Sequence, residues 1–167
     1  MLRAPEPEDT DFMLEVENSE ESLDAGGAAT GLYSRFQMNR FITESANDIF
    51  TDRQMRWIIC LAPDGRPAGM IDVFDFSPRH SRAEVGIVVC EAYRRQGIAS
   101  AALRMVCAHC MERLGIHQLY AYIREDNEAC LRTFQGEGFK VAGLLEDWVM
   151  TGRGYDNVRL VQKTVKS

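Results

Sequence analysis

The segment Cys90–Ser100 constrains the fold more than any other part of the chain, because it joins a strand pattern to a helix pattern through a short glycine-containing loop. Residues 83–90 are rich in β-branched side chains, which predicts a buried strand. After the loop, apolar residues recur at steps of three and four, the period of a helix that faces a core: Leu103, Val106, Cys107, Cys110, Met111 and Leu114. We therefore expect the fold to be built around a strand–loop–helix unit.

The loop has the composition of an anion-binding site. A helix N-terminus leaves backbone N–H groups unpaired and carries partial positive charge, so it can receive a phosphate. Small residues at Gly97, Ala99 and Ser100 allow close approach to the backbone, and Arg94 and Arg95 add positive charge. The spacing Arg-x-x-Gly-x-Ala differs from that of a nucleotide P-loop and of a dinucleotide site. A purely structural turn is the alternative interpretation.

This loop resembles the acyl-CoA pyrophosphate loop of the GNAT superfamily of N-acyltransferases, whose pattern is Arg/Gln-x-x-Gly-x-Gly/Ala. A second motif, from Asn127 to Phe139, is similar to the family's Asn-x-x-Ala-x-x-x-Tyr-x-x-x-Gly-Phe. In the family the asparagine hydrogen-bonds the pantetheine arm, while a helix cap is the alternative role for Asn127. The resemblance implies acetyl-CoA as co-substrate and no metal, with these coenzyme-binding residues: Ile87, Val88, Val89, Arg94, Arg95, Gln96, Gly97, Ile98, Ala99, Ser100, Asn127 and Phe134.

Two positions depart from the second motif. Cys130 replaces alanine, and Phe134 replaces the tyrosine that in many relatives is proposed to protonate the departing thiolate. Phenylalanine has no proton to give, so water or another donor, such as Tyr120 or Tyr122, would have to serve. A core aromatic residue on an amphipathic helix is the alternative interpretation of Phe134.

The implied chemistry needs a neutral amine, because an ammonium ion has no lone pair. Glu84 is placed as the family's strand carboxylate is, and it could accept the amine proton directly or through water. A structural carboxylate paired near Arg82 is the alternative. Further carboxylates on neighbouring strand ends could recognise a cation: Asp72, Asp75, Glu146 and Asp147. The three histidines show no triad or ligand spacing.

Composition limits the class of protein. The 167 residues suffice for a single domain, 1–167, and the 46% hydrophobic and 26% charged residues fit a globular protein. No apolar run approaches the roughly 18 residues of a membrane span, and the N-terminus lacks a signal peptide's apolar core. A cytoplasmic location is expected. The five cysteines are expected to be reduced thiols.

The net charge of −6 is unevenly distributed. Residues 1–34 contain nine acidic side chains and one basic side chain, for a local charge of −8. A nucleic-acid binder would show the reverse bias, so no nucleic-acid partner is expected. The acidic segment is interpreted either as a solvated helix face or as a negative field that attracts a cationic substrate.

The chain order matches the resemblance. Strands are expected at 2–4, 57–61, 68–76, 83–90, 118–123, 139–146 and 158–164, and helices at 10–16, 32–43, about 98–114 and 127–135, with a loop at 18–30. We therefore expect an α/β (α+β) GNAT fold, with a mixed, mostly antiparallel sheet of about seven strands flanked by about four helices.

Within the superfamily, the opening residues and the closing turn look like the bacterial spermidine and ribosomal-protein N-terminal acetyltransferases. The expected activity is direct acetyl transfer to a primary amine, most simply a polyamine or other small cationic amine. Protein N-terminal or aminoglycoside amines are the enzymatic alternatives, and a catalytically weak acyl-CoA-binding sensor is the alternative from another class. A homo-oligomer is compatible with the sequence.

Overall fold

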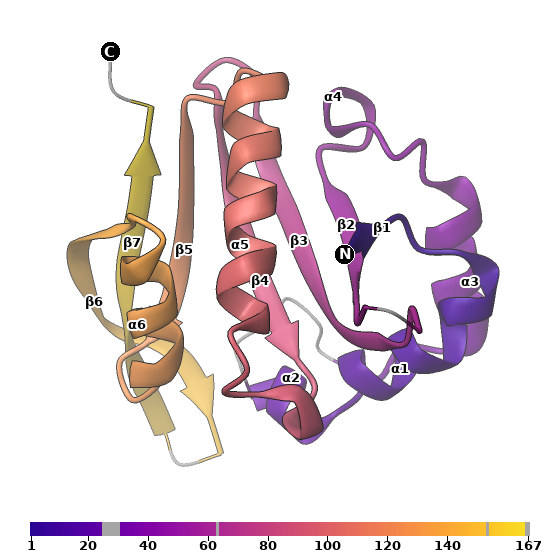
Figure 1. Ribbon diagram of the computed structural model, residues 1–167. Coiled ribbons are helices and arrows are strands. Elements are labelled where there is room, and N and C mark those ends of the chain that lie inside the picture. The colour runs from indigo at the N-terminus through magenta and orange to yellow at the C-terminus, as the bar shows by residue number, and fades with distance from the viewer. Residues whose placement is uncertain (25–30, 63, 153, 166–167) are drawn as a thin grey trace.

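Figure 1 shows the computed structural model, which describes residues 1–24, 31–62, 64–152 and 154–165. A seven-stranded sheet has the order β1-β2-β3-β4-β5-β7-β6, and β4–β5 is its parallel pair. The mixed, mostly antiparallel sheet of about seven strands predicted from the sequence is confirmed. Its strands are β1 (Leu2–Arg3), β2 (Met55–Cys60), β3 (Pro67–Ser77), β4 (Arg82–Val89), β5 (Gln118–Arg124), β6 (Lys140–Thr151) and β7 (Gly154–Thr164).

The described residues form six α-helices rather than about four. They are α1 (Thr10–Glu17), α2 (Glu20–Asp24), α3 (Arg35–Glu44), α4 (Ile49–Asp52), α5 (Ile98–Ala108) and α6 (Glu128–Gly136). A π-helical turn, His109–Arg113, continues α5. The two short helices α2 and α4 account for the difference in number.

Local capping explains these differences. Helix α4 was missed, although the Asp48 carboxylate accepts hydrogen bonds from the N–H groups of Phe50 and Thr51 at its start. Helix α2 occupies part of the segment predicted as a loop at 18–30, of which 25–30 lie outside the described residues. Helix α3 begins at Arg35 rather than at Leu32, because Ser34 and Gln37 form a capping box. Positions 63 and 153, in the connections between β2 and β3 and between β6 and β7, also lie outside the described residues.

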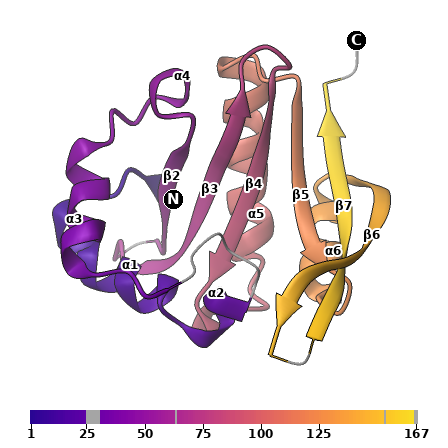
Figure 2. The same cartoon turned by 180° about the vertical axis from the view of Figure 1, so that it is seen from behind.

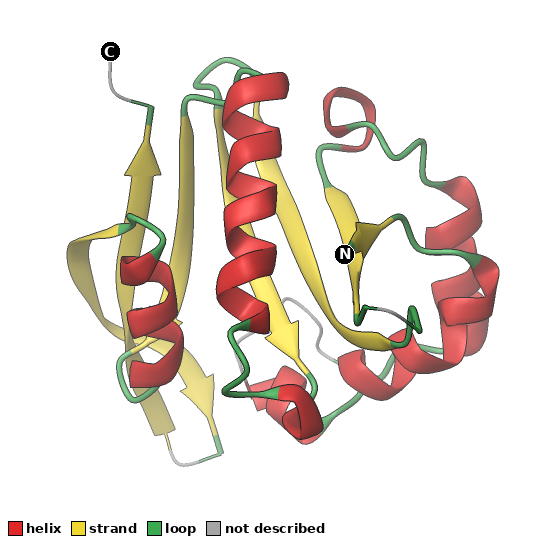
Figure 3. Ribbon diagram, viewed as in Figure 1, coloured by secondary structure: helices red, strands yellow, loops and turns green. Residues whose placement is uncertain are grey.

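Helices cover both faces of the sheet (Figure 3). The main core lies between the sheet and the α5–α6 layer, where Leu103 and Val106 of α5 pack with Val73 and Val85 of the strands. A second core forms on the opposite face, where α1 and α3 pack on β2 and β3. Figure 2 shows α1 and α2 near the end of the sheet where β4 terminates.

Strands β4 and β5 separate soon after they meet. Their pairing runs from Arg82↔Gln118 to Glu84↔Tyr120, although β4 continues to Val89 and β5 to Arg124. The divergence is visible in Figure 2. Beyond Glu84, β4 remains paired with β3, but its backbone groups on the β5 side face an opening in the sheet instead of a neighbouring strand.

Two β-bulges flank this opening. The pairing register shifts between Phe74 and Ser77 in β3 and between Leu145 and Val149 in β6. Asp75 and Asp147, within these shifts, both have φ of 49°, in the left-handed region that side chains rarely adopt. A bulge adds a residue to one strand and redirects the side chains around it.

Among the described residues, no helix combines the length and the apolar character needed to cross a bilayer. All five cysteines are free, as predicted.

Candidate functional site

Two adjoining cavities occupy the opening between β4 and β5. The larger, of about 800 Å³, lies beside the N-terminus of α5. The second, of about 510 Å³, reaches the α1–α2 side and is lined by Glu84, Tyr122 and Trp148 among others. Both are lined by Ile87, Val88, Asn127 and Cys130. We call the two adjoining cavities together the passage, because they share this wall and extend from the N-terminus of α5 to the acidic N-terminal helices.

The larger cavity gathers most of the residues predicted to bind the coenzyme. Its lining includes Ile87, Val88, Val89, Arg94, Arg95, Gly97, Ile98, Ala99, Ser100 and Asn127. Gln96 is not part of this lining, since its side-chain amide donates to the Ala92 carbonyl oxygen at 3.4 Å. Gly97 is the N-cap of α5 with φ of 75°, and a Cβ added there would meet nothing within 4 Å. The backbone of the loop is therefore open to a ligand at the start of the helix.

Arg94 joins this loop to the N-terminal helices. Its guanidinium donates to the Val89 carbonyl oxygen at 2.8 Å and to the Glu21 carboxylate of α2 at 2.5 Å. Arg95 is exposed beside it, with φ of 61°. The two arginines therefore differ. Arg94 makes hydrogen bonds within the protein, whereas Arg95 is exposed at the cavity.

Asn127 caps helix α6 and lies at the wall of both cavities. Its side-chain oxygen accepts the Cys130 N–H at 3.1 Å. Burial raises the pKa of the Cys130 thiol to about 11, so the thiol is protonated at neutral pH.

Phe134 lies in the protein core. Its side chain is 1% exposed and meets the Phe139 ring edge-on, with centroids 4.9 Å apart. It also contributes to the wall of the second cavity, without a hydroxyl group. The interpretation of Phe134 as a core residue is confirmed. Its place in the cavity wall is also compatible with a position that faces the coenzyme.

Glu84 lies at the last residue pair before β4 and β5 separate. Burial, together with the negative charge of Asp75, raises the pKa of its carboxyl to about 7. The ion pairs among the described residues do not include one between Glu84 and Arg82. The alternative of a structural ion pair is therefore not what the geometry shows. The side chain can bind or release a proton close to neutral pH.

On the α1 side of the second cavity, the carboxylates are partly paired. Arg56, which was not singled out from the sequence, contacts Glu17 at 2.6 Å and Asp72 at 2.7 Å, and lies 5.0 Å from the centroid of the Phe41 ring. A basic residue alternating with apolar ones in a strand was the available signal. Asp72 is thus part of a charged network and does not stand alone as a cation site.

An exposed aromatic pair forms the opposite wall. The rings of Tyr122 and Trp148 stack with centroids 5.8 Å apart and planes 25° apart, and Trp148 is 54% exposed. Trp148 therefore belongs to the cavity wall and not to the core. Glu146 and Asp147, beside it on β6, are exposed and do not line the cavity.

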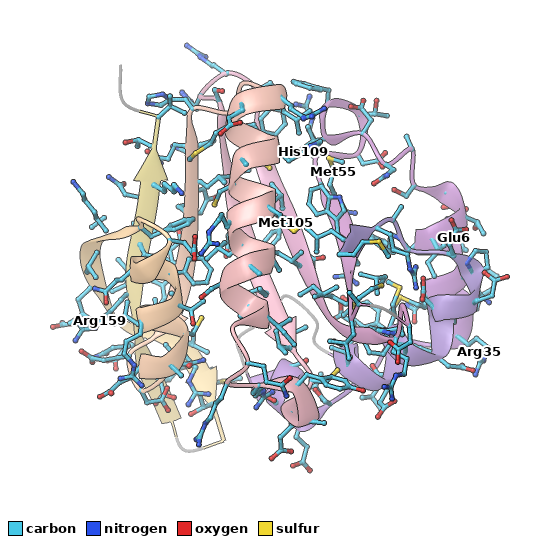
Figure 4. All side chains as sticks on the ribbon, in the orientation of Figure 1. Glu6, Arg35, Met55, Met105, His109 and Arg159 are labelled. Atoms are coloured by element: carbon cyan, nitrogen blue, oxygen red, sulfur yellow. The ribbon has the colours of Figure 1, made fainter. Side chains whose placement is uncertain are left out.

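The histidines do not contribute to the described linings of the two cavities. Figure 4 shows His109 and Met105 on the helix with Met55 nearby on β2, and His109 meets Trp57 edge-on at 5.8 Å. Within the described ranges, His, Cys, Asp and Glu side chains do not assemble a group of three or more suited to a metal ion.

Solved structures of similar fold include two of spermidine N-acetyltransferase from Vibrio cholerae. One, in complex with CoA and spermine, has a TM-score of 0.87 and 17% identity, covering 98% of this chain and 94% of the other. A dodecameric structure in an intermediate state has a TM-score of 0.83 and 17% identity, covering 98% and 92%. At this level of identity, the likeness shows a shared fold.

In sequence, the chain is 26% identical over 98 residues to spermidine N(1)-acetyltransferase of Escherichia coli strain K12, covering 58% of this chain. The match spans about half, 53%, of that relative's length. The family model described as the acetyltransferase (GNAT) domain matches residues 1–140. With most of its length matched by that model, and with the sheet order and opening described above, this chain belongs to the GNAT acetyltransferase domain family.

Proposed function

We propose that this protein is an acetyl-CoA-dependent N-acetyltransferase that acts on a polyamine or another small cationic amine. The observation that carries the proposal is the passage, which connects the open α5 N-terminus to the half-buried carboxyl of Glu84. The names of the relatives in Escherichia coli and Vibrio cholerae support a polyamine acceptor.

The residues present fit an acyl-CoA. Backbone N–H groups at the start of α5, opened by Gly97, suit a pyrophosphate. The separated edge of β4 at Ile87 and Val88 offers backbone groups to a pantetheine chain, and Asn127 lines the same passage. When bound, the coenzyme would supply an activated acetyl group.

Glu84 serves in this proposal as the proton acceptor for the incoming amine. A group with a pKa near the working pH combines a large unprotonated fraction with useful basicity, and Glu84 meets that condition. Transfer would then be direct, from coenzyme to amine, without an acyl-enzyme.

The acidic N-terminal segment would attract the acceptor. Glu17 and Glu21 are engaged by Arg56 and Arg94, while Glu20 is exposed. Long-range attraction depends on the local charge of −8 as a whole rather than on any one of these carboxylates.

A thiol-release assay with an acceptor panel tests this function. We expect spermidine to be acetylated faster than a neutral peptide N-terminus, and kcat/KM for spermidine to fall severalfold as salt rises through the physiological range, because salt screens exposed charges. Preference for the peptide, with no salt dependence, would favour protein N-terminal acetylation. Coenzyme binding without turnover on any amine would favour a sensor.

The Phe134 position offers a second prediction. We expect Phe134→Tyr to raise kcat modestly, most at high pH, because a hydroxyl at the cavity wall can protonate the leaving thiolate where solvent is a poor proton source. Phe139→Tyr is the matched control, since it adds the same hydroxyl to the partner ring, which does not line the cavity. An equal response of both variants in pH-dependent assays would contradict the assignment of this wall.

We also propose that the chain works in the cytoplasm and forms a homo-oligomer. The dodecamer described for the Vibrio cholerae relative supports the second point.

A further inference from the structure

Asp75, in the strand next to Glu84, has an unusual backbone conformation at a β-bulge. Asp75 and Phe76 together face a single partner position in β4, because the pairing passes from Phe74↔Glu84 directly to Ser77↔Arg82. Phe76 then returns to the core that contains Val73 and Val85. The extra residue leaves Asp75 with a left-handed backbone, φ 49°, a conformation that costs energy and that often marks a functional position.

A buried tyrosine holds the Asp75 carboxylate. The Tyr120 hydroxyl donates to Oδ2 of Asp75 at 2.6 Å, and Tyr120 is itself 8% exposed. Tyr120 is also the β5 partner of Glu84 at the last pair before the strands separate. The bulge in β3 and the tyrosine of β5 thus place a second carboxylate beside Glu84 at the apex of the opening.

The titratable and charged groups around Glu84 come from strands β3, β4 and β5, and Glu17 of α1, which is paired with Arg56, lines the same cavity. Strand β3 contributes Asp75, and Asp72 diagonally across, which is paired with Arg56. Strand β5 contributes Tyr120 and its neighbour Tyr122. Strand β4 itself carries the exposed Arg82 two residues earlier. Among these neighbours, Asp75 is the one whose negative charge raises the pKa of Glu84.

We propose that Asp75, held by Tyr120, is a positioning residue that strengthens Glu84 as the proton acceptor for the attacking amine. This inference rests on the proposed function. Asp75 acts through its negative charge, because a nearby anion favours the protonated form of Glu84 and so makes its carboxylate a stronger base.

The acceptor arrives as an ammonium ion; one N–H bond breaks and an O–H bond forms on Glu84. The nitrogen lone pair attacks the thioester carbonyl carbon, the C–S bond breaks, and the sulfur leaves with the electron pair. The sulfur takes the second nitrogen proton, directly or through water, and Glu84 releases its proton to solvent.

The test is Asp75→Asn, because asparagine has the same shape and tolerates a left-handed backbone. Glu84 must be unprotonated to act, so activity is lost as pH falls through its pKa. Removing the Asp75 charge lowers that pKa. We expect the acid limb of the kcat/KM profile with spermidine to move down by about one pH unit. We expect the high-pH plateau to fall about threefold, because the base is weaker.

Two further variants make the result specific. Tyr120→Phe keeps the Asp75 carboxylate but removes the hydrogen bond to it. We expect a smaller shift of the acid limb in the same direction. Asp147→Asn is the matched control, since Asp147 lies in the other bulge with the same φ and does not line the cavity, and the acid limb should stay in place. Thermal melting of each variant reports on folding.

A second readout does not depend on turnover. Carbon NMR of glutamate side chains labelled at the carboxyl should show one resonance, absent in Glu84→Gln, that titrates near pH 7 and moves to lower pH in Asp75→Asn. An unmoved resonance and an unmoved acid limb would overturn the inference while leaving Glu84 as the base. Full activity in Glu84→Gln would instead remove the proposed role of Glu84 itself.

Discussion

Gly97→Glu is expected to abolish acetyl-CoA binding while the fold persists. Gly97 is the N-cap of α5 at φ 75°, where the helix directs its unpaired N–H groups and partial positive charge outward. A glutamate places a carboxylate on the site proposed for the pyrophosphate and repels it. We expect the loss to exceed a hundredfold in Kd by calorimetry, equivalent to about 3 kcal/mol or more.

Two controls separate charge from backbone strain. Gly97→Ala imposes the left-handed penalty without charge, and we expect a loss of only a few-fold. Gly65→Glu introduces the same residue at φ 72° with equally open space, in the turn between β2 and β3 away from the cavities. Wild-type affinity in Gly97→Glu, with the protein still folded, would show that the α5 N-terminus does not hold the coenzyme.

Glu84→Gln is expected to lower kcat/KM for spermidine by about 10²–10⁴-fold, the usual contribution of a general base. Glutamine keeps the shape and hydrogen-bonding capacity of the side chain but cannot accept the amine proton. In the wild type, activity should decline as pH falls through about 7, where Glu84 becomes protonated, and the variant should lack this acid limb. Steady-state kinetics across pH measures both effects.

The coenzyme affinity provides the control for this variant. Because Glu84 lies at the apex of the passage and not at the α5 N-terminus, Glu84→Gln should bind acetyl-CoA with wild-type affinity. Glu112→Gln, an exposed carboxylate in the π-helical turn after α5, should retain wild-type kinetics and pH dependence. A Glu84→Gln enzyme with normal kcat and an unchanged acid limb would assign the proton transfer to another group.

The sheet and its main helices were predictable because their signals are local and repeated. The apolar run of β4 and the helical period of α5 each extend over enough residues to be recognised in the sequence, and Gly97 between them marks the turn. The short helices α2 and α4 were not predicted, since each has too few residues to show a period. Their caps, such as Asp48 for α4, were the only available signal.

The coenzyme side of the site was more predictable than the acceptor side. Contiguous residues form the loop at α5, so a motif can identify them together. The acceptor side is assembled across strands: Tyr120 reaches Asp75 over 45 positions, and Arg56 reaches Asp72 over 16. The bulges that aim Asp75 and set the position of Trp148 depend on strand register, which no single segment encodes.

The most direct test of the proposed activity is mass spectrometry of spermidine incubated with acetyl-CoA and the purified wild-type protein. We expect spermidine to gain one acetyl group, one free coenzyme A thiol to appear for each acetyl transferred, and Glu84→Gln to form far less product in the same time. Unmodified spermidine after prolonged incubation, from a protein that still binds acetyl-CoA, would contradict the proposed activity.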